Sequence, residues 1–363
     1  MRVNSKISSG AFWKRREFFL IVLVFCSLVV LYTVQAPKPS TTFQIASHHY
    51  SGTQEHYLKY SSTSTSYKIA IIADKDTRSH NPSKNHWESV IRYGTLSRDP
   101  KTSKYSVVWD EEDVIVTSKL SEGGRGMELS ELVHYNGFLY APDDRTGIVY
   151  KIVDNMVIPS HILMNGDGNT NKGFKAEWAT VKDGNLYIGG IGKEWINNEG
   201  VLINNHPQWV KIIDQNGSVE HVDWGRNFDE LRKAVGAQHP GYLWHEAVRW
   251  NPITRQWLFL PRRFSDEPYD EALDEKRATN LLISANEDFT KITSTRIGTL
   301  SATRGFSTFV LVPQREMEAI AIKSEEVEGK VASYLTAFNI QTGEILMEEQ
   351  FIAAEKFEGM EIL

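Results

Sequence analysis

The stretch FVLVPQREMEAIAIKSEEVEGKVASYLTAFNIQTGEILMEEQF, residues 309–351, decides the fold. It contains four short apolar runs, which the polar sequences QREM, EEVEG and IQTGE separate. Apolar runs of this length bounded by turn residues predict four consecutive antiparallel strands. A four-stranded meander is the unit of a β-propeller blade, so a propeller fold predicts further copies of it along the chain.

Five segments share one feature, a polar or acidic residue that enters an apolar, alternating strand. They are LSELVHYNGFLY, KAEWATVKDGNLY, LWHEAVRWNPITRQWLFL, RGFSTFVLV and FEGMEIL, with Glu131, Glu177, Glu246, Ser307 and Glu358 at the shared position. Two of the intervals exceed the ~40–50 residues of a usual blade. Each of those two contains a polar insertion, residues 193–209 and 262–280.

The last copy ends at Leu363 after a single strand and needs partners. The strand KIAIIAD, residues 68–74, and the strands after it can supply the outer part of that blade. We therefore predict an all-β fold, a five-bladed β-propeller over residues 67–363 that closes by pairing its two ends. Helical periodicity is weak and confined to residues 85–96 and 228–236.

Residues 1–66 have a different character. Phe18 to Val34 is an uncharged apolar run preceded by five basic residues. This arrangement predicts a cytosolic tail (1–17), a type II transmembrane signal-anchor (18–34) and a flexible stem (35–66). A cleaved signal peptide is the alternative. Both place the propeller in the secretory pathway. The anchor would hold it on an ER or Golgi membrane with the propeller lumenal, and cutting the stem would release a secreted form.

The net charge limits which partners the protein can bind, and the cysteine content limits which disulfides it can form. The net charge is −6, and removing the +4 of residues 1–17 leaves −10 for the rest, so we expect no nucleic-acid binding. The only cysteine, Cys26, lies in the predicted anchor, so the propeller has no disulfide. Asn216 in NGS is a glycosylation sequon.

In a propeller, the five shared positions would lie around one end of the central channel. Carboxylates brought together repel one another unless a cation lies between them. Ca²⁺ accepts carboxylate, hydroxyl and carbonyl oxygens in irregular geometry. His245 is the only histidine adjacent to a shared acid, which disfavours zinc or copper. The sequence therefore predicts a central calcium site.

Ten ordered motifs cover residues 67–363: IAIIADKDT, GRGMELSEL, DDRTGIVY, GFKAEW, GKEW, GYLWHE, FLPRR, GFS, KSEE and KFEG. Together they closely resemble the calcium-activated nucleotidase (apyrase) family of animals and blood-feeding insects. The resemblance implies a five-bladed propeller that hydrolyses nucleoside di- and triphosphates with calcium in its central tunnel. Carried onto this chain, its calcium ligands are Ser130, Glu131, Glu177, Glu246, Ser307 and Glu358.

The motifs also supply residues for phosphate chemistry. Arg125, Lys175 and Arg262 are candidates to bind phosphate. Catalytic candidates are Arg125 and the acids that would position or deprotonate a water, Asp74, Asp76, Glu128 and Asp144, with Asp74 preferred as the base. Each also has a structural interpretation, as a turn residue or an inter-blade ion pair. Trp178, Trp195 and Trp244 are expected in the inter-blade core, and the alternative is that they are platforms on which bases stack.

We expect a lumenal nucleoside diphosphatase that prefers UDP and GDP, with ADP or triphosphates as further substrates. The resemblance implies a role in glycosylation, where hydrolysis clears the product of glycosyltransferases. The sequence leaves open whether two chains form a homodimer. The alternatives are a non-catalytic, calcium-stabilised propeller that binds a protein or glycan, and a calcium-propeller lactonase or esterase with His245 as its base.

Overall fold

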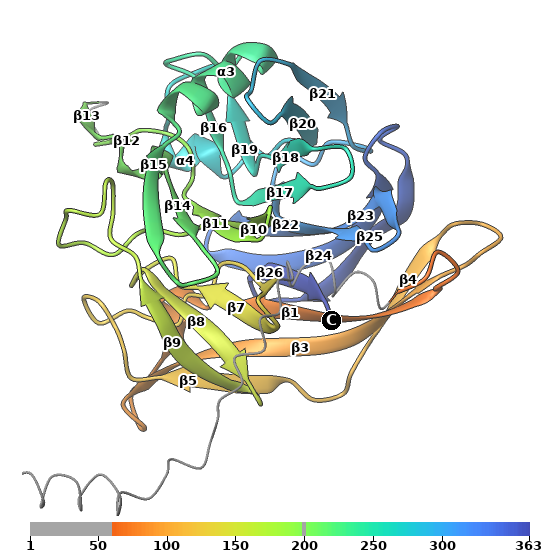
Figure 1. Ribbon diagram of the computed structural model, residues 1–363, viewed down its shortest axis with the longest axis horizontal. Coiled ribbons are helices and arrows are strands. Elements are labelled where there is room, and N and C mark those ends of the chain that lie inside the picture. Colours follow the sequence, from red (N-terminus) through yellow and green to blue (C-terminus); the bar gives the residue numbers. More distant parts are fainter. Residues whose placement is uncertain (1–59, 198–200) are drawn as a thin grey trace, which may run out of the picture. The chain divides into compact units, whose positions relative to one another are not determined.

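Short apolar runs form strands throughout residues 60–197 and 201–363, which are the residues that the computed structural model describes. The strands build five antiparallel sheets arranged as the blades of a β-propeller (Figure 1). The predicted fold class and blade number are confirmed. The innermost strands of neighbouring blades contact one another around the whole ring, from β6 through β10, β17 and β22 to β26 and back to β6.

Four of the blades are four-stranded sheets, each with its strands in chain order from the centre outwards. Their strands are β6 (Val133–Tyr135), β7 (Phe138–Pro142), β8 (Ile148–Val153) and β9 (Met156–Ile162); β10 (Trp178–Lys182), β11 (Asn185–Gly189), β14 (Trp209–Ile213) and β15 (Val219–Asp223); β17 (Ala247–Asn251), β18 (Gln256–Leu260), β20 (Leu281–Asn286) and β21 (Ile292–Arg296); and β22 (Arg304–Val312), β23 (Arg315–Val327), β24 (Lys330–Asn339) and β25 (Ile345–Ala353).

The fifth blade joins the two ends of the described chain, as predicted. Its innermost strand β26 (Phe357–Ile362) pairs with β1 (Ser66–Ala73), which pairs with the long strand β3 (His86–Arg98). The far edge of β3 pairs with three strands, β2 (His80–Asn81), β4 (Tyr105–Trp109) and β5 (Val114–Ser118). The short helix η1 (Asp76–Ser79) lies between β1 and β2 in the chain. Backbone pairing thus closes the ring.

Two details of the prediction need correction. The turn EEVEG is shorter than predicted, because β23 continues to Val327 and only Glu328 and Gly329, both with positive φ, connect it to β24. The weak helical periodicity at residues 85–96 does not lead to a helix, because this segment forms the strand β3. Its pairing with strands on both sides outweighs the local periodicity. The weak helical periodicity at residues 228–236 corresponds to the helix α3 (Gly225–Val235).

The two predicted insertions are confirmed. Residues 193–209 hold the hairpin strands β12 (Trp195–Ile196) and β13 (Leu202–Asn204), followed by η2 (His206–Gln208). Residues 262–280 hold β19 (Arg263–Ser265) and α4 (Glu271–Asp274), and β19 pairs with β16 (Tyr242–Trp244), which precedes the third blade.

The chain before the propeller is described only from Tyr60. The Tyr60 hydroxyl donates a 2.6 Å hydrogen bond to the carbonyl of Leu363, so the end of the predicted stem contacts the last blade. The predicted cytosolic tail and signal-anchor, and the stem up to residue 59, lie outside the described residues. Within the described part of the chain, no helix is long and apolar enough to span a membrane.

The centre of the ring is occupied by the guanidinium of Arg249, on β17. Its N–H groups donate to four carbonyls at 2.7–3.2 Å, those of Leu132, Ala179, Phe309 and Met360. These carbonyls belong to β10, β22 and β26 and to the residue before β6. Each innermost strand has an unpaired edge toward the channel, and a buried carbonyl without a donor is costly. Arg249 therefore joins its own blade to the other four.

Glu131 completes this central cluster. Its carboxylate lies 3.2 Å from Arg249 and accepts hydrogen bonds from the Thr308 hydroxyl and the Leu132 and Met360 amides. Gly359, on β26, permits the close approach, because a Cβ there would lie 2.4 Å from the carbonyl carbon of Glu131. The channel below its mouth is thus packed with side chains.

We expect Arg249→Met to lower the free energy of unfolding by about 3–5 kcal/mol, because it leaves Glu131 and several buried carbonyls without their donor. Urea denaturation of the purified propeller measures this. Arg255→Met removes an arginine of the same blade whose side chain is 51% exposed and pairs with Asp183 and Glu287. We expect little change there, and equal losses in the two variants would contradict the central role of Arg249.

Candidate active site

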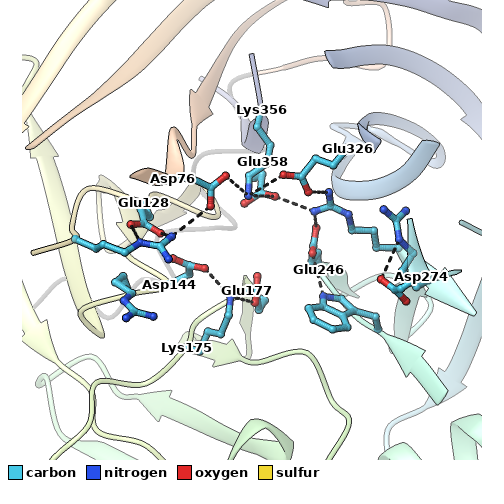
Figure 2. Close-up of a pocket in the computed structure, with 15 residues that line it drawn as sticks. Asp76, Glu128, Asp144, Lys175, Glu177, Glu246, Asp274, Glu326, Lys356 and Glu358 are labelled. Carbon is cyan, nitrogen blue, oxygen red and sulfur yellow. Dashed lines mark hydrogen bonds and ion pairs between the residues drawn. The ribbon is translucent and has the colours of Figure 1, made fainter. Parts of the chain in front are cut away.

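A cavity of about 320 Å³ opens over the starts of the innermost strands (Figure 2). Its lining is almost entirely charged, and it draws on loops of all five blades. It is lined by Asp76, Arg125, Glu128, Asp144, Arg145, Lys175, Glu177, Trp244, Glu246, Arg262, Arg263, Asp274, Glu326, Lys356 and Glu358.

Three of the predicted calcium ligands meet at the floor of this pocket. Glu177 directly precedes β10, Glu246 directly precedes β17, and Glu358 is the second residue of β26. Burial raises the pKa of Glu177 to about 8, and repulsion from Glu246 adds to the effect of burial. Burial also raises the pKa of Glu358 well above its usual range, again with repulsion from Glu246. Glu246 thus lies close enough to both other carboxylates to oppose their ionisation.

Cations lie between these acids. Lys175 contacts Asp144 at 2.6 Å and Glu177 at 2.5 Å. Arg262 contacts Glu246 at 2.6 Å and Glu358 at 3.0 Å, and also pairs with Glu326. The acids raise the pKa of both basic groups well above its usual value although burial opposes this, so both stay charged.

Lys356 is a third cation of the pocket, and it joins the floor of the pocket to one wall. Its ammonium lies 2.7 Å from Asp74, 3.2 Å from Asp76 and 3.4 Å from Glu358. Asp74 follows β1 and Lys356 immediately precedes β26, so this cluster depends on the closure of the ring.

Asp74, Asp76 and Glu128 form an acidic group at that wall, where Asp76 and Glu128 line the pocket and Asp74 is fully buried without lining it. One oxygen of each lies within 4.8 Å of the others, close enough for the three to hold a metal ion together. The Asp74 carboxylate accepts from the Asp76 amide at 2.7 Å, and Glu128 accepts two hydrogen bonds from Arg125. The structure therefore brings together three of the four acids predicted to act on the water.

The acids of this wall differ in protonation. Burial would raise the pKa of Asp74, but the ammonium of Lys356 outweighs it and holds the pKa below its usual value. Burial raises the pKa of Glu128 to about 7, with repulsion from Asp144 and Asp74, although Arg125 opposes the shift. Asp74 is therefore an ionised acceptor at neutral pH, whereas Glu128 titrates near it.

Asp143 holds the two loops that form this wall. Its buried carboxylate accepts from the Met127 amide at 2.8 Å and from the amides of Arg145 and Thr146 at 2.8 and 3.0 Å. Met127 has φ of +58°, an unfavourable backbone conformation for a non-glycine residue. The contact stabilises that conformation directly before Glu128.

Three predicted metal ligands do not line the pocket. The Ser130 hydroxyl donates to the carbonyl of Ala176 at 2.7 Å, and Glu131 belongs to the central cluster around Arg249. Ser307 lies behind the floor, where its hydroxyl is 3.4 Å from Glu246. Their role as ligands stays a prediction.

The sequence analysis missed six pocket residues. Lys356 carried a signal, because KFE at 356–358 repeats the spacing of KAE at 175–177, and side chains two apart on an extended strand share a face. Glu326 lies in the quoted motif KSEE. The other four are Arg145, Trp244, Arg263 and Asp274.

The expectation for the tryptophans holds only in part. Trp178 is fully buried in the core between the second and third blades, packed against Trp224 at a ring distance of 5.9 Å. For Trp195 it is wrong, because that side chain is 42% exposed on the β12–β13 hairpin. Trp244 lines the pocket instead of filling a core.

His245 is not placed to act as a base. It is 1% exposed, its ring packs against those of Phe228 and Phe259 at 5.4 and 5.2 Å, and it does not line the pocket. Neither ring nitrogen has a hydrogen-bond partner among the described residues. Burial lowers its pKa to about 3, so the ring is neutral. The geometry gives no support to a lactonase or esterase that uses this histidine.

The model of one protein family, described as Apyrase, matches residues 74–363. The chain belongs to the apyrase family. It is similar to soluble calcium-activated nucleotidase 1 of Rattus norvegicus, with 45% identity over 82% of this chain and 74% of the relative. It is also similar to an apyrase of Cimex lectularius, with 43% identity over 82% of both chains. Apyrase apy-1 of Caenorhabditis elegans is 42% identical over 83% of this chain and 86% of the relative.

The neutral, buried His245 predicts a pH dependence of stability. Histidine in an unfolded chain titrates near ~6.5, so acidification below this value favours the unfolded state down to about pH 3, by roughly 1 kcal/mol at pH 5.5. Part of the stability lost between pH 7.5 and 5.5 comes from protonation of this histidine in the unfolded chain. We expect this part of the loss to be absent in His245→Phe, as measured by urea denaturation at the two pH values. The exposed His80→Phe is the control, and an unchanged pH slope in His245→Phe would contradict the assignment.

Proposed function

We propose that the protein is a Ca²⁺-dependent nucleoside diphosphatase that hydrolyses UDP and GDP to the monophosphate and phosphate, and accepts triphosphates. Membership of the apyrase family supports nucleotide hydrolysis. The observation that carries the proposal is the pocket itself, where carboxylates and cations alternate. A diphosphate needs cations to offset its charge and acids to orient a water, and this pocket holds both.

The oxygen donors of the floor fit calcium. Glu177, Glu246 and Glu358 supply carboxylates, the Ser307 hydroxyl lies behind them, and neither histidine nor cysteine lines the pocket in the described part of the chain. The name of the Rattus norvegicus relative, soluble calcium-activated nucleotidase 1, also supports calcium. When bound, Ca²⁺ would offset the negative charge of the phosphates and of the floor.

Arg125, Lys175 and Arg262 are the proposed phosphate-binding residues, with Lys356 beside them. All four line the same pocket, and Lys175 and Lys356 point into it from opposite sides (Figure 2). Guanidinium groups bind phosphate oxygens in pairs, whereas an ammonium acts as a point charge. Because each also pairs with a carboxylate, its position is determined before substrate arrives, which lowers the cost of orienting the diphosphate.

Asp74 is the proposed base. It orients a water and accepts its proton while the water oxygen attacks the terminal phosphorus, and the bond from that phosphorus to the bridging oxygen breaks. The nucleoside monophosphate leaves with the electron pair of that bond. The low pKa of Asp74 keeps it ionised, and Asp76, Glu128 and Asp144 lie on the same wall to hold the water.

The setting of the reaction is part of the proposal. The apolar run at 18–34 and the basic residues before it support a membrane-anchored enzyme with its propeller in the ER or Golgi lumen. Hydrolysis of UDP and GDP there removes the product of glycosyltransferases and so supports glycosylation. Asn216 lies exposed in the turn between β14 and β15, where a glycan would be accommodated.

Phosphate release from UDP, GDP and ADP in millimolar calcium or magnesium tests the function. We expect activity with calcium and little with magnesium. Glu177→Gln should lose most of it and bind calcium at least tenfold more weakly by calorimetry, because the floor loses one carboxylate. Equal activity with magnesium or in the variant would overturn the mechanism. No release from any nucleotide would favour a non-catalytic propeller.

Asp74→Asn tests the base. We expect kcat for UDP to fall by roughly 10²–10⁴ with little change in KM, because the loss of a general base acts on the chemical step. The control is Asp113→Asn, which changes an aspartate of the outer part of the same blade that pairs with Arg92. A fall in kcat of less than tenfold would assign the base to another acid of this wall.

A further inference from the structure

The pocket has two chemically different ends. Asp76, Glu128 and Asp144 lie together at one end, and Asp274 lies at the other, beyond Glu246 (Figure 2). The proposed hydrolysis uses the first end, which leaves the wall around Asp274 without a role. This wall is built from β16, β19 and α4, which lie outside the four-stranded blade sheets, and β19 and α4 belong to the insertion at residues 262–280.

An aromatic surface forms part of this wall. The Trp244 indole donates to Glu246 at 3.0 Å, which holds the ring at the edge of the pocket next to the floor. The Tyr269 ring stacks against it, with centroids 6.2 Å apart and planes at 29°. Rings held in this way are platforms on which nucleobases stack, at about 1–3 kcal/mol per base.

A donor and an acceptor lie beside this surface. Arg263 pairs with Trp244 across the β16–β19 ladder, is 4% exposed, and lies 3.4 Å from the carboxylate of Asp274. Both Arg263 and Asp274 line the pocket, and Nη1 of Arg263 has no hydrogen-bond partner among the described residues. The Tyr242 hydroxyl donates to Asp274 and orients its carboxylate.

This pair distinguishes the bases by their hydrogen-bonding edges. A guanidinium only donates and an ionised carboxylate only accepts. Uracil offers an N3–H next to a carbonyl, and guanine an N1–H next to O6, so both complement the pair. Cytosine and adenine have an acceptor nitrogen next to an amino group, the reverse arrangement, which would leave Arg263 and Asp274 unsatisfied.

We propose that Arg263 and Asp274, beside the Trp244 ring, form a nucleobase subsite that selects uracil and guanine by their adjacent N–H and carbonyl groups. This inference rests on the proposed nucleotide hydrolysis. The subsite would account for a preference for UDP and GDP. Arg263 and Asp274 belong to the insertion at residues 262–280 and lie at the end of the pocket opposite the proposed base.

UDP and CDP provide the sharpest comparison, because their bases differ at the edge that the subsite reads. We expect the wild-type kcat/KM for UDP to exceed that for CDP by ~10-fold or more, since the wrong edge leaves buried polar groups unpaired. In Asp274→Asn this ratio should approach one, because an amide can donate as well as accept. Glu271→Gln, an exposed change on the same short helix, is the control and should keep the wild-type ratio.

A second measurement uses the unaltered protein. UDP methylated at N3 lacks the N–H that Asp274 would accept, and its kcat/KM should fall to that of CDP or below. Wild type that hydrolyses UDP and CDP equally, or a UDP preference that Asp274→Asn retains, would overturn the subsite and leave the hydrolysis intact. Wild type that hydrolyses no nucleotide would overturn the proposed function and the subsite with it.

Discussion

The unpaired inner edges of the five innermost strands are the constraint on which the structure depends. Each blade ends at the channel with backbone carbonyls that no further strand can satisfy. Arg249 donates to carbonyls contributed by the four other blades, and Glu131 lies against it while accepting hydrogen bonds from two backbone amides. One buried guanidinium thus holds the five blades together without a disulfide.

The pocket inherits its geometry from this ring. The innermost strands begin at the same end of the channel. For this reason Glu177, Glu246 and Glu358, which are far apart in the sequence, lie together on the floor of the pocket. Lys175, Arg262 and Lys356 lie between them and offset their repulsion, so charges that would be unstable singly in a buried site are tolerated together. The same alternation suits a site that takes up a divalent cation and a polyanion.

Closure of the ring also assembles the acidic group beside the pocket. Asp74 leaves β1 at one end of the propeller sequence and Lys356 enters β26 at the other, and their 2.7 Å contact exists only because these strands pair. Asp143 then ties the loops that carry Glu128 and Asp144 to each other. The floor is therefore built from the repeated part of the blades, whereas the two ends of the pocket come from loops and insertions.

The sequence by itself determined the blade, the five repeats and the closing strand, because alternation and turn residues act between near neighbours in the chain. It also predicted three floor acids, since they recur at one position of the repeat. Only the tertiary structure decided that residues 85–96 form a strand, that Glu131 pairs with Arg249, and that Trp244 faces the pocket with Arg263 and Asp274. These outcomes depend on contacts between segments with no common pattern, and such contacts form only after the blades have packed.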